Sequence, residues 1–197
     1  MPYVVLKIYR IKSLLILIIL MVIFMNKKFI IYNIILTFIM GFLVHGIYEW
    51  FPSIITTIFP VNESLFEHIK LIYLSPIFSS IILYLYFKKK NYPISNLLFG
   101  LIVSTIYNII IFYLIYLPLY RSYGAVMWMT LLIYFITIIL SNYLYYLIII
   151  LPNSKRLNII SAFMIIIILG ILTYFTYHPE KIEFFRDPET HNYGINK

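Results

Sequence analysis

Apolar residues form long runs along this chain, and the breaks between the runs are short and charged. Five runs come close to or exceed the roughly 20 residues that a helix needs to cross about 30 Å of hydrocarbon. They are Phe29–Tyr48, Leu65–Phe87, Ile94–Leu117, Gly124–Leu151 and Leu157–Tyr177. Open strands would leave backbone groups unpaired in lipid, so helices are the form to expect. The pattern therefore predicts an all-α integral membrane protein with about five transmembrane helices.

One further apolar run, Ser13–Met25, follows three basic residues near the start of the chain. This order is typical of a signal peptide, but no small-residue cleavage site follows the run. With 13 residues, the run is also short for a span. Two interpretations of residues 1–24 stay open: an extension upstream of a natural start at Met25, or an additional amino-terminal hydrophobic helix. We expect residues 1–24 to be dispensable.

Composition supports a single membrane domain over residues 25–177, followed by a polar extramembrane tail over residues 178–197. The chain is 63% hydrophobic and only 11% charged, which lies far outside the usual composition of a soluble domain. Cysteine is absent, so disulfides, thiolate metal sites and cysteine nucleophiles are excluded.

The net charge of +8 does not indicate a nucleic-acid partner, because the basic residues lie in small groups at the ends of apolar runs. Membrane lipid is the expected surrounding, and the oligomeric state is left open. Placing Lys27 and Lys28 in the cytoplasm also places Lys88 to Lys90, Lys155 and Arg156 there, as the positive-inside rule requires. We therefore expect a multi-pass protein of the cell membrane whose carboxyl terminus lies outside the cytoplasm.

Acidic residues and histidines are few, and they lie in two segments that this topology brings to the same side of the membrane. One segment joins the first two spans, and the other is the tail. An ionisable group near the apolar phase costs free energy unless it is paired. We therefore expect one polar cluster at the outer membrane face. Its candidate members are His45, Glu49, Asn62, Glu63, Glu67, His68, His178 and Asp187.

Imidazole and carboxylate ligands without cysteine suit zinc or another divalent metal ion. The candidate ligands are His45, Glu49, Glu67 and His68. Structural roles compete with this interpretation: His45 can pair with Glu49 one helical turn away, and Ser64 with Glu67 matches a capping box at the start of the second span. No catalytic residue can be assigned.

Three segments carry a resemblance to a known family: HGIYEW at residues 45–50, PVNESLFEHIKL at residues 60–71, and FRDPET at residues 185–190 with Tyr193 and Gly194 after it. They resemble a domain of unknown function in small multi-pass bacterial membrane proteins, found mainly in Gram-positive organisms. Phe66 and His191 stand where the family pattern has Trp and Gly. The resemblance covers roughly Met25 to the end and implies no activity or catalytic residue.

Several function classes fit these features. The leading hypothesis is a multi-pass membrane protein with an outward-facing His/Glu cluster as its functional centre. A metal-dependent membrane hydrolase acting on a lipid or envelope precursor would need several cluster residues to converge on one ion. A small-solute or ion transporter would use polar helix stripes headed by His68 and Thr130, although no inverted repeat is present. In a structural or assembly protein, the cluster residues would serve only as helix caps and as hydrogen-bonded or ionic pairs.

Overall fold

The computed structural model describes residues 27–89 and 95–195, so the expectations for residues 1–24 lie outside the described residues. Five helices are long and apolar enough to cross a membrane: α2 (Lys27–Trp50), α3 (Leu65–Lys88), α4 (Leu97–Tyr123), α5 (Met127–Ile149) and α6 (Lys155–Tyr177). The short 3-10 helices η1 (Ile55–Ile58) and η2 (Glu183–Phe185) lie in the α2–α3 loop and in the tail. No β-strand occurs in the described residues, and the predicted all-α membrane fold is confirmed.

The largest boundary difference is at α4, where the apolar run was expected to end at Leu117. The helix instead continues through Pro118 to Tyr123. Proline is tolerated inside membrane helices because neighbouring groups can compensate for the lost hydrogen bond. The helix ends where Gly124 adopts φ 74°, a positive value that glycine reaches without steric cost.

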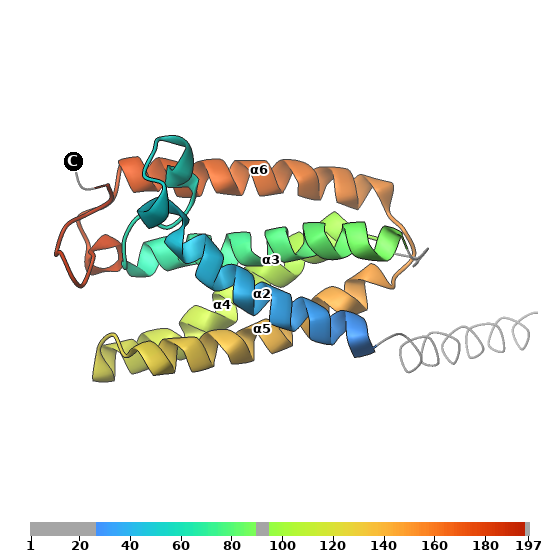
Figure 1. Cartoon of the computed structure of the whole chain (residues 1–197), viewed down its shortest axis with the longest axis horizontal. Coiled ribbons are helices and arrows are strands. Elements are labelled where there is room, and N and C mark those ends of the chain that lie inside the picture. Colours follow the sequence, from blue (N-terminus) through green and yellow to red (C-terminus); the bar gives the residue numbers. More distant parts are fainter. Residues whose placement is uncertain (1–26, 90–94, 196–197) are drawn as a thin grey trace, which may run out of the picture.

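Helix α3 lies at the centre of the bundle and contacts α2, α4 and α6 (Figure 1). Helix α4 packs along α5, while α2 crosses α3 and reaches α5 on the other side. Since successive helices run in opposite directions, one end of the bundle gathers the carboxyl ends of α2, α4 and α6 and the amino ends of α3 and α5. We call this the site end. The tail, residues 178–195, also lies there.

The tail folds back over the loop between α2 and α3. Phe185 of η2 stacks on Phe66 of α3, with ring centroids 4.4 Å apart. The Asn62 side chain donates a hydrogen bond to the carbonyl of Gly194 at 2.9 Å. A single antiparallel bridge between Arg186 and Tyr193 closes the turn between these two contacts. The tail is therefore a packed part of the site end.

Polar side chains join α2, α3 and α5 inside the bundle. The Asn33 side chain donates a hydrogen bond to Asn142, and the Ser79 hydroxyl donates to Asn33 Oδ1 at 3.1 Å. The hydroxyls of Thr37 and Ser79 lie 2.8 Å apart. All four side chains are buried, so each would lose free energy without its partner.

We expect Asn142→Leu to lower the free energy of unfolding by about 1 kcal/mol, because polar contacts between membrane helices contribute about 0.6 to 2 kcal/mol. Unfolding of the purified protein in mixed micelles measures the change. Ile139→Leu, on the exposed face of the same helix, is the control. An Asn142→Leu protein as stable as this control would contradict the prediction.

Candidate metal centre at the site end

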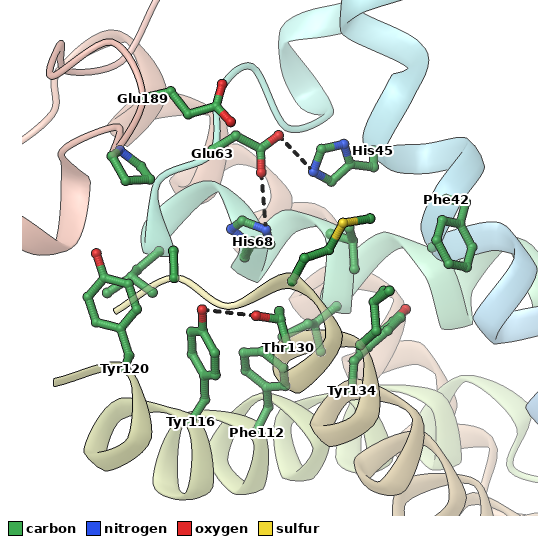
Figure 2. A pocket seen from close by; sticks show the side chains of 18 residues that line it. Phe42, His45, Glu63, His68, Phe112, Tyr116, Tyr120, Thr130, Tyr134 and Glu189 are labelled. Atoms are coloured by element: carbon green, nitrogen blue, oxygen red, sulfur yellow. Dashed lines mark hydrogen bonds and ion pairs between the residues drawn. The ribbon is translucent and has the colours of Figure 1, made fainter. Parts of the chain in front are cut away.

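Three side chains from separate elements converge at the site end: His45 from α2, Glu63 from the following loop and His68 from the first turn of α3 (Figure 2). One ligand atom from each residue lies within 4.8 Å of the others. His45 Nε2 is 3.1 Å from Glu63 Oε1, and His68 Nε2 is 3.7 Å from Glu63 Oε2. The two imidazole rings lie 5.8 Å apart, between centroids. An ion with ligand bonds near 2 Å fits between groups at such distances after small rotations.

The second ring nitrogen of His68 already has a partner. Its Nδ1 lies 2.9 Å from the carbonyl oxygen of Ser64, one turn earlier in the helix. A ring nitrogen that donates to a backbone carbonyl fixes the tautomer, and the other nitrogen is then a free electron-pair donor. This contact directs His68 Nε2 toward Glu63, as is common for histidines that bind metal ions.

Glu63 lies in a loop whose backbone is held on both sides. The Val61 amide donates to Glu67 Oε2 at 3.2 Å, and the Ser64 amide donates to Asn62 Oδ1 at 2.9 Å. The carboxylate of Glu63 is 38% exposed, so water can reach it. The hydrogen bond with His45 lowers the pKa of Glu63, and burial opposes this effect only in part. Glu63 is therefore held as a carboxylate facing two imidazoles.

A buried ion pair anchors the loop that carries Glu63. Lys70 Nζ lies 2.7 Å from Glu67 Oε2 and also donates to the carbonyls of Thr57 and Phe59 at 2.8 and 3.2 Å. The other carboxylate oxygen of Glu67 accepts from Thr176 of α6 at 2.8 Å. Both charged side chains are at most 1% exposed. The pair thus connects α3 to the α2–α3 loop and to α6.

This arrangement corrects the capping box expected from Ser64 and Glu67. Ser64 does cap α3, because its side chain accepts from the Glu67 amide at 3.2 Å. The Glu67 carboxylate, however, turns to Lys70, and the Ser64 amide is satisfied by Asn62. The charge of Lys70 attracts Glu67 more strongly than a neutral amide can.

The structure separates the other predicted site residues from the three ligands. Glu67 belongs to the buried ion pair, and Asn62 holds the loop and the tail. Glu49 is exposed and stands outside the group of ligand atoms. His178 stacks on Tyr174, with ring centroids 4.6 Å apart, beside the outer face of α6. Asp187 accepts bonds from the Glu189 amide and the Thr190 hydroxyl, which shape a turn of the tail.

Of the four metal ligands expected from the sequence, the group of ligand atoms therefore contains His45 and His68 but neither Glu49 nor Glu67. Glu63, expected in the cluster without a ligand role, supplies the carboxylate instead. A glutamate one position before the helix cap projects from the loop, whereas Glu67 in the first turn faces the buried lysine.

A cavity of about 620 Å³ opens directly beneath the three ligands (Figure 2). Its volume lies in the range of small-molecule sites, about 300 to 1,000 Å³. The polar rim consists of His45, Glu63, His68 and the tail residue Glu189. Deeper walls come from α2, α3, α4 and α5, and they include Phe42, Leu71, Ile72, Phe112, Leu131 and Tyr134. The candidate metal centre thus stands at the mouth of a largely apolar cavity.

Two site-end residues escaped prediction from the sequence. Lys70 was counted only as a topological charge, although a lysine inside an apolar span needs a partner and Glu67 stands three positions before it. Glu189 was not distinguished from the other acids of the tail, because nothing in the sequence places it over the cavity.

Comparison with known proteins agrees with this description at the level of the family. The chain belongs to the family of unknown function DUF6512, whose model matches residues 18–195. The match includes residues 18–24 of the amino-terminal segment. No curated protein and no solved structure matches the chain.

Proposed function

We propose that this protein is a metal-dependent membrane hydrolase that acts at the outer membrane face on a lipid or envelope precursor. The observation that carries the proposal is the convergence of His45, Glu63 and His68 within 4.8 Å at the mouth of an apolar cavity. Two histidines and one carboxylate are a ligand set that binds catalytic zinc, and three protein ligands leave a coordination position open for water or substrate. A structural zinc site is closed by a fourth protein ligand.

Each residue has a distinct part in the proposed reaction. Zinc would lower the pKa of a bound water and polarise the scissile carbonyl. His45, Glu63 and His68 would hold the ion, and the Ser64 carbonyl would keep His68 in the ligating tautomer. Glu189, whose side chain lies beside Glu63 over the cavity, is the carboxylate available to accept the proton of the attacking water (Figure 2).

A hydrolysis assay tests the proposal. The full-length protein is placed in phosphatidylcholine vesicles, stripped with a chelator, and given a fluorogenic acyl ester before and after zinc is returned. Turnover should appear only with zinc and should fall by more than about 100-fold in Glu63→Gln, because even partners of ligands contribute about 10- to 100-fold. Equal rates with and without zinc would contradict a metal-dependent enzyme.

The outward orientation of the site is part of the proposal, and it is supported by the charges at the two ends of the bundle. Lys88, Lys89, Lys155 and Arg156 lie at the end opposite the three ligands. By the positive-inside rule, these charges support a site end and a carboxyl terminus outside the cytoplasm.

A reporter fused after Lys197 tests this orientation. Alkaline phosphatase, which is active only outside the cytoplasm, should be active there, and a fluorescent protein that folds only in the cytoplasm should be dark. The same pair of reporters inserted after Lys89, between α3 and α4, should give the opposite result. A fluorescent carboxyl-terminal fusion would contradict the orientation and place the site in the cytoplasm.

A further inference from the structure

The cavity beneath the ligands reaches the outer surface of the bundle between α2 and α5. Phe42 of α2 and Met127 of α5 both line it, and their side chains are 49% and 76% exposed. Farther from the site end the two helices meet: Phe38 packs on Phe135 and Tyr134, with ring centroids 5.2 and 6.0 Å apart. The helices therefore separate toward the site end, and the cavity opens sideways between them.

The lining changes from polar to apolar with depth. The three ligands and Glu189 form the rim, while the lower walls contain Phe112, Leu131 and Ile72. Within the walls, the Thr130 hydroxyl donates a hydrogen bond to the Tyr116 hydroxyl at 3.0 Å. Such a gradient matches a molecule with a polar head and an apolar chain.

The charged residues that line the cavity limit the charge that the polar head of such a molecule can carry. Glu63 and Glu189 both carry carboxylates, and no lysine or arginine is among the described residues that line the cavity. Among the cations at this end of the bundle in the described residues, Lys70 is buried against Glu67 and Arg186 lies 3.6 Å from Glu183. Arg121, which follows the lining residue Tyr120, is exposed and is not part of the lining. A phosphate head is usually held by arginine or lysine, and in the zinc-free cavity it would meet two like charges.

We infer that the substrate is a membrane-resident acyl ester or amide with an uncharged or cationic head, which enters sideways from the outer leaflet between α2 and α5. The inference rests on the proposed function, and it adds the substrate class and the route. The carbonyl lies at the three ligands, and the chain lies along Phe42 and Leu131. Water adds hydroxide to the carbonyl carbon, the C–O or C–N bond breaks, and the water's proton leaves with the alcohol or amine.

Photo-crosslinking tests binding independently of catalysis. Two probes share one diazirine-bearing acyl chain: a monoacylglycerol with a neutral head, and a lysophosphatidic acid whose phosphate carries about −1.5 to −2 charges. Each is added to full-length protein in phosphatidylcholine vesicles, and labelled peptides are mapped. In zinc-free protein, the monoacylglycerol should label α2 near Phe42 and α5 near Leu131 about tenfold more than the phosphate probe. Equal labelling by both probes would overturn the charge selection.

Neighbouring positions on α5 provide a matched pair of variants. Leu131 lines the cavity, whereas Leu132 is 51% exposed and is not among the lining residues. Leu131→Trp should reduce monoacylglycerol labelling about tenfold by filling the chain site, and Leu132→Trp should leave it unchanged. Glu189→Lys should raise labelling by the phosphate probe. Equal labelling of the two tryptophan variants would mean that the probe had reacted from the surrounding bilayer and not from the cavity, and the inference would fail.

Competition in the unaltered protein keeps the test independent of how the variants fold. Unlabelled monoacylglycerol at a low fraction of total lipid should abolish the mapped labelling, because a single site saturates. Labelling that does not compete would overturn the inference. The crosslink forms without turnover, so binding and hydrolysis are measured separately. Saturable labelling in a protein that hydrolyses no ester would refute the proposed hydrolase, whereas the binding site between α2 and α5 would still be supported.

Discussion

Replacing His45 or His68 with alanine should lower the affinity for zinc by more than about 100-fold. Each histidine supplies one of three ligands, and the two remaining groups hold an ion much less tightly than three. Loss of even a hydrogen-bonding partner of a ligand costs about 10- to 100-fold. Competition with a chromogenic chelator on purified, zinc-free protein measures the affinity. We expect His68→Ala to have an effect at least as large as His45→Ala, because His68 is also oriented by the Ser64 carbonyl.

His178→Ala is the matched control. This histidine lies on the same end of the bundle, but it is exposed and stacks on Tyr174 of α6. Zinc affinity should therefore be unchanged. The assignment of the ligands would be contradicted if His178→Ala lowered zinc affinity as much as His68→Ala does. It would also be contradicted if neither substitution changed the affinity.

Lys70→Ala should lower the free energy of unfolding by about 3–5 kcal/mol, the usual cost of leaving one charge of a buried pair without its partner. The Glu67 carboxylate would remain buried, and the carbonyls of Thr57 and Phe59 would lose their donor. Replacing both charges, Glu67→Gln with Lys70→Met, should recover much of the loss because no unpaired charge then remains. Unfolding in mixed micelles provides the measurement.

Lys181→Ala in the exposed part of the tail is the control for charge removal, and it should change stability by less than about 0.5 kcal/mol. Zinc affinity should also fall in Lys70→Ala, since the ion pair holds the loop that positions Glu63. If Lys70→Ala were as stable as Lys181→Ala, the ion pair would not be the anchor of that loop.

The membrane fold could be predicted from the sequence because hydrocarbon demands long apolar helices. Helix ends could be predicted less well, as Pro118 shows: the local rule stops a helix before proline, whereas α4 continues. The polar stripe beginning at His68 was open to two interpretations, a hydrated path or contacts between helices. Farther along that stripe, Ser79 bonds to Asn33 and lies beside Thr37 of α2, so no described contact there favours a transporter.

The site was predictable as a region but not residue by residue. Glu63 and Glu67 are both acids near the start of α3, and from the sequence we expected Glu67 as a metal ligand or as a helix cap, with no ligand role for Glu63. Their roles depend on long-range contacts: Thr176 of α6 holds Glu67, and Gly194 of the tail holds Asn62 beside Glu63. These contacts span more than a hundred residues of sequence, so no local pattern contains them.

X-ray absorption at the zinc edge, on the purified full-length protein loaded with one equivalent of zinc, tests the central claim most directly. We expect two imidazole nitrogens at about 2.0–2.1 Å with the remaining ligands oxygen, and one imidazole in His68→Ala. Zinc surrounded by oxygen alone, or a spectrum identical in the wild-type and His68→Ala proteins, would contradict a metal centre built from His45, Glu63 and His68.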